Sequence, residues 1–131
     1  MNPDDLLFAE THEWIRLEDT DGEKIAVVGI TAFAVEQLVD VTYLEMQPAG
    51  TPASAGKEIG EIESVKAVSS IISPVDGEII AVNEELANNL QLLGDDPYQA
   101  GWMAKIRVQD EAAIEKLMDR AAYEAQCAEE G

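Results

Sequence analysis

The stretch Glu63-Ser64-Val65-Lys66-Ala67-Val68 decides the fold of this chain, because strand-like residues flank it on both sides. Residues 57–63 alternate polar and apolar side chains, as a half-buried strand does, and residues 68–72 are rich in β-branched residues and serine. The pattern predicts a β-hairpin with Lys66 at its tip, bracketed by small residues. A lysine presented in this way suits acylation by another enzyme, and the alternative is an ordinary surface lysine.

The turn after this hairpin is predicted at Pro74-Val75-Asp76-Gly77, where the Asp-Gly pair favours a positive φ at the glycine. Gly60-Glu61-Ile62 before the lysine and Gly77-Glu78-Ile79 after it resemble each other. This similarity is a faint sign of an internal two-fold repeat.

The rest of the chain predicts a series of short elements. Strands are expected over residues 13–17 and 24–30, joined by a turn at 19–23, and over 39–46, 78–82 and 102–108. A short helix is expected over 32–38 with Thr31 as its N-cap, and a helical turn at 83–86, whereas 87–101 reads as a loop.

A longer helix is predicted from Asp110 to about Ala128. Its apolar residues recur at helical spacing, which predicts one face packed against a sheet: Ile114, Leu117, Met118, Ala121 and Ala122. Residues 1–11 read as a leader of uncertain structure. With 131 residues, a single domain over 1–131 is expected.

The charge of the chain excludes some functions. It has 27 acidic residues against 8 basic ones, a formal net charge of −19. Such a surface repels phosphate backbones and anionic membranes, so nucleic-acid and membrane partners are not expected. It suits docking to basic patches on partner proteins, or a solubility adaptation to a saline or alkaline habitat.

Few residues are available for catalysis or metal binding. Cys127 is the only cysteine and His12 the only histidine, so no disulfide, cysteine metal cluster or multi-histidine site is expected. No nucleophile–base pair stands out, which argues against a free-standing enzyme. No signal segment or membrane-length apolar run is found, and a reduced, soluble, cytoplasmic protein is predicted.

The residues resemble the H protein of the glycine cleavage system over about Ala9 to Tyr123. The resemblance rests on a series of motifs in order: Thr11-His12-Glu13-Trp14, Val28-Gly29-Ile30-Thr31, Glu36-Gln37-Leu38, Gly60 to Ala67, Ser73 to Ile79, Val82-Asn83, Asp96-Pro97-Tyr98 and Gly101-Trp102-Met103. Biotin carriers typically place methionines beside the modified lysine, and 2-oxoacid dehydrogenase lipoyl domains place Asp before it. Val65 and Ala67 flank Lys66 here, as in H proteins.

The resemblance implies a mainly β fold, a biotinyl/lipoyl-carrier type sandwich (barrel-sandwich hybrid) with short helices and a C-terminal helix. It also implies a non-enzymatic carrier with lipoate joined covalently to Lys66. The arm would shuttle an aminomethyl group between a pyridoxal-phosphate glycine decarboxylase and a folate-dependent aminomethyltransferase. Dihydrolipoamide dehydrogenase would reoxidise the arm, and a lipoate-attaching ligase or transferase would install it.

The family pattern also implies a cleft for the loaded arm. Glu13 matches the carboxylate that faces the loaded amine, and other cleft positions surround it: Thr11, Ile30, Gln37, Leu38, Ala67 and Ser70. A carboxylate is the chemically sensible partner for an ammonium group. Without the family pattern, Glu13 would be read as one more surface acid.

Some positions depart from the family. Many H proteins carry an acid where Ser70 stands, glycine where Val39 stands, and polar residues at Ala32 and Val35. Loss of the acid at Ser70 weakens support for a loaded amine, and Ser70→Asp is expected to restore it. An alternative is an H-like lipoate-binding protein that carries sulfur intermediates with a heterodisulfide-reductase-like complex in sulfur oxidation. An unmodified interaction module is a further alternative, which the retained Lys66 motif disfavours.

Overall fold

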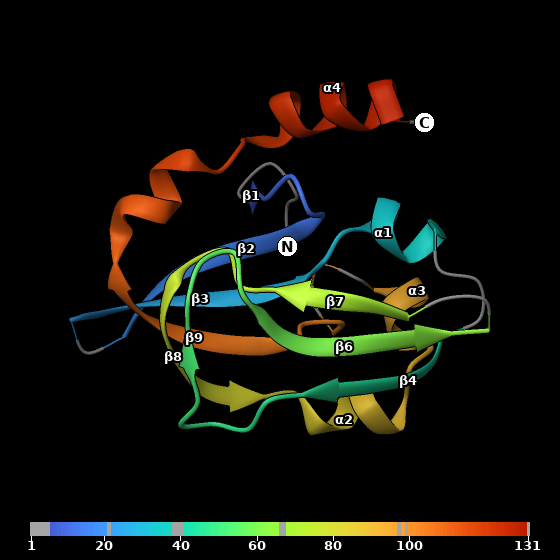
Figure 1. The fold of residues 1–131 in the computed structure, drawn as a ribbon, viewed down its shortest axis with the longest axis horizontal. Coiled ribbons are helices and arrows are strands. Elements are labelled where there is room, and N and C mark those ends of the chain that lie inside the picture. Colours follow the sequence, from blue (N-terminus) through green and yellow to red (C-terminus); the bar gives the residue numbers. More distant parts are fainter. Residues whose placement is uncertain are drawn as a thin grey trace.

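The computed structural model describes residues 6–20, 22–37, 41–65, 68–96, 98 and 100–130. Two antiparallel sheets form a sandwich (Figure 1), which confirms the predicted fold class. The larger sheet has the order β1 (Leu7–Phe8), β2 (Glu13–Thr20), β3 (Glu23–Ile30), β9 (Ala104–Asp110), β8 (Asp76–Val82) and β5 (Pro52–Ala53). The smaller sheet has the order β4 (Val41–Met46), β6 (Glu58–Ser64) and β7 (Val68–Ile72).

In the described part of the chain, three short helices lie between strands, and two more follow the last strand. They are α1 (Ala32–Gln37), α2 (Glu84–Asn88), α3 (Leu92–Asp95), a 3-10 helix (Glu111–Lys116) and α4 (Arg120–Glu130). The predicted N-cap at Thr31 is confirmed, since its hydroxyl accepts the amide of Ala34 at 3.2 Å. The Asn83 side chain accepts the amide of Leu86 and so caps α2, although it was not among the predicted caps. The predicted loop over 87–101 is wrong in two respects, because α2 continues to Asn88 and α3 follows it.

Both predicted hairpins are confirmed. β2 pairs with β3 from Glu13↔Ile30 to Thr20↔Glu23, and β6 pairs with β7 up to Glu63↔Val68. Lys66 and Ala67 lie outside the described residues, between the two strands of the second hairpin.

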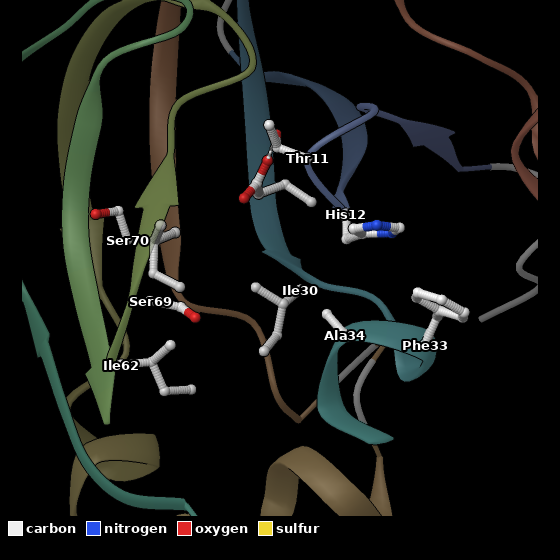
Figure 2. Close-up of a pocket in the computed structure, with 10 residues that line it drawn as sticks. Thr11, His12, Ile30, Phe33, Ala34, Ile62, Ser69 and Ser70 are labelled. Carbon is white, nitrogen blue, oxygen red and sulfur yellow. Dashed lines mark hydrogen bonds between the residues drawn. The ribbon is translucent and has the colours of Figure 1, made fainter. Parts of the chain in front are cut away.

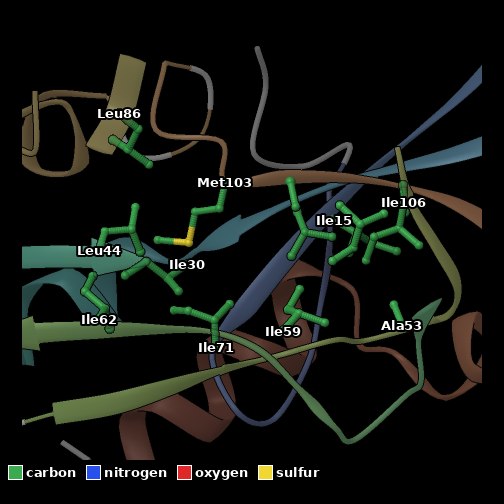
Figure 3. Close-up of a cluster of buried hydrophobic side chains, with 14 of the residues drawn as sticks. Ile15, Ile30, Leu44, Ala53, Ile59, Ile62, Ile71, Leu86, Met103 and Ile106 are labelled. Carbon is green, nitrogen blue, oxygen red and sulfur yellow. The ribbon is translucent and has the colours of Figure 1, made fainter. Parts of the chain in front are cut away.

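The core lies between the inner faces of the two sheets (Figure 3). Ile62 and Ile71 from the smaller sheet face Ile15 and Ile106 from the larger one, and all four are about 1% exposed or less. Their burial follows from the period of two along each strand, which sends alternate side chains inward. A fully buried side chain of this size contributes roughly 1.5–3 kcal/mol to stability.

The prediction that Gly77 takes a positive φ is wrong, because positive φ among the glycines occurs at Gly22, Gly50 and Gly56. Gly77 instead begins the regular part of β8, beside a register shift in the pairing with β9. A Cβ atom there would lie 2.0 Å from the carbonyl oxygen of Arg107. Glycine is therefore required by the close approach of two strands rather than by the turn.

Gly60 has the same role on the other side of the sandwich. A Cβ atom at Gly60 would lie 2.4 Å from the Met46 sulfur and 2.8 Å from the Glu45 carbonyl oxygen, and β6 also shifts register there. The two Gly-Glu-Ile sequences thus occupy equivalent positions, each beside a bulge where a neighbouring strand passes closely. This agrees with the faint repeat in the sequence.

The single helix predicted from Asp110 to about Ala128 is wrong. A 3-10 helix ends at Lys116, and Met118 then forms a two-way backbone bridge with Phe8, with both N–O distances 2.8 Å. The Asp119 carboxylate accepts the amide of Ala122 and so caps the start of α4. The residues predicted to form one buried apolar face do not all pack inward, because Ala121 and Ala122 are exposed.

The helix α4 lies beyond β1, at the edge of the larger sheet (Figure 1). Its anchor is Tyr123, which is 5% exposed and stacks on Phe8 with the ring centroids 4.6 Å apart. Trp14 and Val27 complete this second cluster, which Cys127 joins at its margin. Within the described residues, no helix is long and apolar enough to cross a membrane.

Candidate functional site

A cleft opens between the β6–β7 hairpin and the segment that joins β1 to β2 (Figure 2). The cavity measures about 270 Å³. Thr11, His12 and Glu13 form one side, and Ser69, Ser70 and Ile71 of β7 form the other. Ile30 and Ile62, with Phe33 and Ala34 of α1, complete a largely apolar lining.

Glu13 is the polar centre of this cleft. It begins β2, its side chain is 2% exposed, and one carboxylate oxygen accepts the hydroxyl of Thr11. The other oxygen accepts the backbone amide of Ile72 on β7 at 3.3 Å. Burial raises the pKa of the Glu13 carboxyl to about 7, and it outweighs the lowering effect of these hydrogen bonds.

This environment gives Glu13 a distinctive chemistry. A carboxyl group with a pKa near 7 shares its population between neutral and charged forms at neutral pH. An incoming cation favours the charged form, since opposite charges a few ångströms apart interact strongly in a sheltered site. The cleft therefore suits a ligand with an apolar stem and a positively charged head.

Two serines on β7 are placed differently. Figure 2 shows the hydroxyl of Ser69 directed toward Ile30, whereas the hydroxyl of Ser70 points away from it. Ser70 pairs across the sheet with Glu61, so its outer side faces an acidic neighbour. Both residues line the cavity, and of the two side chains that of Ser69 is directed inward.

The structure brings together four of the predicted site residues, Thr11, Glu13, Ile30 and Ser70, in one cavity. Gln37 is the last residue of α1, and its side chain is outside the described part of the structure. Leu38, Lys66 and Ala67 are outside the described residues altogether, as are the departure at Val39 and the first strand residues predicted at 39–40. The other two departures, Ala32 and Val35, lie on α1.

Sequence reasoning missed several lining residues, chiefly His12, Phe33 and Ser69. His12 was considered only as a catalytic or metal-binding group. Its position between two predicted cleft residues, Thr11 and Glu13, was the available signal. Ser69 could have been chosen over Ser70 from the period of two along β7, because Ile71 is buried.

The cleft can hold an extended apolar chain that ends in a positively charged group. Apolar side chains (Ile30, Ile62 and Phe33) can cover a hydrocarbon and sulfur stem. Glu13 begins β2 and is hydrogen-bonded to Ile72 on β7. It supplies the one buried carboxylate among the described residues. Fold and cleft together define a lipoyl carrier of the barrel-sandwich type.

Comparisons with known proteins agree with that class. The family model for the glycine cleavage H-protein matches residues 6–130. The chain is 47% identical to the glycine cleavage system H protein of Rhodopirellula baltica over 130 residues, which cover 99% of this chain and 98% of that protein. It is 48% identical to the corresponding protein of Marinobacter nauticus over 92% of this chain and 91% of the relative.

A solved structure gives the same answer for the fold. The crystal structure of a glycine cleavage system H protein from Mycobacterium marinum superposes with a TM-score of 0.87 at 33% sequence identity. The match covers 97% of this chain and 99% of that one. The chain belongs to the glycine cleavage H-protein family, and nothing in these comparisons supports the sulfur-oxidation alternative.

Proposed function

We propose that this protein carries lipoate on Lys66 and shuttles an aminomethyl group between the enzymes of the glycine cleavage system. The observation that carries the proposal is the buried Glu13 carboxyl in an apolar cleft beside the hairpin that contains Lys66. A sulfur cargo has no use for this buried carboxylate, whereas an ammonium group pairs with it directly.

The residues around Lys66 support its modification. Val65 is 63% exposed and Val68 is 59% exposed, so the described residues on either side of Lys66 and Ala67 present their side chains to solvent. The β6–β7 pairing up to Glu63↔Val68 provides a formed hairpin that a lipoate-attaching enzyme can recognise.

Each side of the cleft contributes separately to holding the cargo. When bound, the lipoyl group supplies a reversible dithiol–disulfide couple that can hold the cargo on one sulfur. The charged form of Glu13 binds the ammonium head of the cargo. The Thr11 hydroxyl and the Ile72 amide each hold one oxygen of the Glu13 carboxylate in place. Ile30, Ile62 and Phe33 exclude water from the stem.

The proposed partners are the pyridoxal-phosphate decarboxylase, the folate-dependent aminomethyltransferase and dihydrolipoamide dehydrogenase. A net charge of −19 supports docking to basic surfaces on these enzymes, with association that weakens as salt rises. The chemistry itself belongs to the partners' cofactors, and the carrier supplies position and shelter.

Intact-mass analysis of protein made with lipoate tests the attachment site. One lipoyl increment is expected in the wild type, and none in Lys66→Ala. Modification that persists in Lys66→Ala, at Lys57 or Lys105, refutes the assignment. Glycine-dependent loading by a decarboxylase from a relative then tests the cargo, and a lipoylated protein that cannot be loaded argues against glycine cleavage.

A further inference from the structure

The strongest unassigned feature is a buried hydrogen-bond junction at the back of the cleft. The hydroxyl of Tyr123, on α4, lies 2.7 Å from Nδ1 of His12 and 2.5 Å from the hydroxyl of Thr31. A tyrosine hydroxyl has one proton and two lone pairs, so it can donate to one of these partners and accept from the other. Its two partners, Thr31 and His12, are 92 and 111 residues away from Tyr123 along the chain.

Each partner of Tyr123 belongs to a different wall of the cleft. His12 stands between Thr11 and Glu13, and it lines the cavity itself. Thr31 caps α1, the helix that carries Phe33 and Ala34 into the cavity. The Tyr123 hydroxyl therefore connects the wall that bears the carboxylate to the wall that bears the apolar cover.

The backbone at His12 shows that this wall is held in place by its surroundings. His12 has φ 73°, the one positive φ of a non-glycine residue among those described. Such a conformation is strained for a residue with a Cβ atom, and it persists where surrounding contacts fix it. The contacts here are the Tyr123 hydroxyl, the stack of the imidazole on Phe33 at 4.8 Å between centroids, and the bond from the Thr31 amide to the His12 carbonyl at 3.0 Å.

The helix α4 has one further tie to the same wall, and the segment just before the helix has another. The Gln126 side-chain amide donates to the Glu10 carbonyl at 2.9 Å, and the Met118 bridge holds Phe8 just upstream. Tyr123 is fixed in turn by its stack on Phe8. The C-terminal helix is thus attached to the segment Ala9–Glu13 at several points, although it does not line the cavity.

We propose that Tyr123 is a positioning residue for the loaded arm: its hydroxyl holds His12 and Thr31 together, so that Glu13 and the α1 cover meet the cargo in a preformed cleft. This inference rests on the proposed function, because the cargo is the aminomethyl group. Removing the hydroxyl leaves the Phe8 stack and the backbone hydrogen bond between Thr31 and His12 intact, but it removes the side-chain link between the two walls. The cleft then has to order itself around the cargo at the moment of binding.

Tyr123→Phe tests the proposal, with Tyr98→Phe as the matched control. The Tyr98 hydroxyl accepts the amide of Ala32 at 3.0 Å, so its loss also removes one hydrogen bond beside α1. It does not contact His12 among the interactions described. The reduced lipoyl protein is loaded with formaldehyde and ammonium, and hydrolysis of the thioether by one water to thiol, formaldehyde and ammonium is followed.

The expected result is that cargo release is about three- to tenfold faster in Tyr123→Phe, as the loss of one sheltered hydrogen bond implies, and little changed in Tyr98→Phe. His12→Asn should act on the same contact, since asparagine also tolerates positive φ. The double variant Tyr123→Phe/His12→Asn should therefore release cargo no faster than the more affected single variant.

A second readout needs no cargo. His12 is the only histidine, so its imidazole nitrogen signals in an NMR spectrum need no assignment. In the wild type and in Tyr98→Phe, the Tyr123 contact should keep the His12 imidazole in one tautomer. In Tyr123→Phe, the population of that tautomer should fall.

The outcomes separate the two proposals. If the wild type loads, and both tyrosine variants retain cargo equally well or lose it equally fast, Tyr123 has no specific positioning role. If the tautomer population in Tyr123→Phe equals that of the wild type, the Tyr123 hydroxyl does not orient the His12 imidazole, and the positioning role is overturned. If the lipoylated wild type cannot be loaded, the proposed function fails and the positioning role fails with it.

Discussion

Replacing Glu13 with glutamine should stabilise the unloaded protein at alkaline pH while weakening its hold on the cargo. The glutamine side chain has the same shape, and it can keep both hydrogen bonds of Glu13. Its carbonyl oxygen accepts the Ile72 amide, and its NH₂ group donates to the Thr11 hydroxyl, which turns to accept. The change therefore removes a buried charge and little else.

The magnitude follows from the raised pKa of Glu13. The folded protein binds the Glu13 proton more tightly than the unfolded chain, whose pKa keeps the ordinary value of 4.5, against about 7 in the fold. This contribution to stability is fully present below pH 4.5 and is lost as the pH rises through about 7. Above that range the buried carboxylate costs about 3 kcal/mol, at roughly 1.4 kcal/mol per pKa unit.

Denaturant unfolding of the unmodified protein measures the effect. Between about pH 5.5 and about pH 8.5, the free energy of unfolding of Glu13→Gln should gain about 2 kcal/mol relative to the wild type. The lower limit stays clear of the isoelectric point near 4.1, where the chain loses its net charge and associates. The other acids titrate equally in both proteins and cancel.

The control is Glu61→Gln, which removes an exposed carboxylate on the outer side of β6. It reports what loss of one negative charge does to a chain with a net charge of −19, and should show a small pH dependence. A stability difference for Glu13→Gln that does not change with pH, or that falls at pH 8.5, refutes the reasoning. When lipoylated and loaded, Glu13→Gln should also release aminomethyl cargo faster than the wild type at pH 8.5.

Three further substitutions test the fold and the cleft. Gly77→Ala should cost about 3 kcal/mol or more, because its Cβ meets the Arg107 carbonyl oxygen, whereas Gly94→Ala, with open space around it, should be neutral or stabilising in thermal unfolding. Ser69→Asp should lengthen the lifetime of loaded protein more than Ser70→Asp, because the Ser69 hydroxyl is directed into the cleft (Figure 2); equal effects would count against that orientation. Thr11→Val removes a donor to Glu13 and should raise the pKa of its carboxyl further, visible in the carboxyl carbon shift as pH varies, and an unchanged or lower pKa contradicts this hydrogen bond.

The hairpins were predictable because their signals are local. Alternation over 57–63 and 24–30 needs only the period of two, and the cap at Thr31 acts within three residues. The family resemblance added the cleft, and Glu13 is the clearest case. One acid among 27 has no distinguishing feature in composition, and its carboxylate accepts the amide of Ile72, which is 59 residues away along the chain.

Glycine is required at position 77, as predicted, but for a different physical reason from the predicted turn. The sequence Asp76-Gly77 has turn chemistry, and glycine is required there. The reason lies in Arg107, which is 30 residues away along the chain and becomes a neighbour only when β8 and β9 pair. No pattern within a window of a few residues contains that contact.

The C-terminal helix was mispredicted for a reason that bears on function. Residues 110–128 have helical spacing throughout, yet the extended break at Leu117–Asp119 lets Met118 exchange two backbone hydrogen bonds with Phe8. A continuous helix would satisfy its own backbone and could not make this bridge. The break lets the chain pair with β1 before α4 begins, and α4 then places Tyr123 against Phe8, His12 and Thr31. The departure from the local pattern is what connects the end of the chain to the wall of the cleft that carries Glu13.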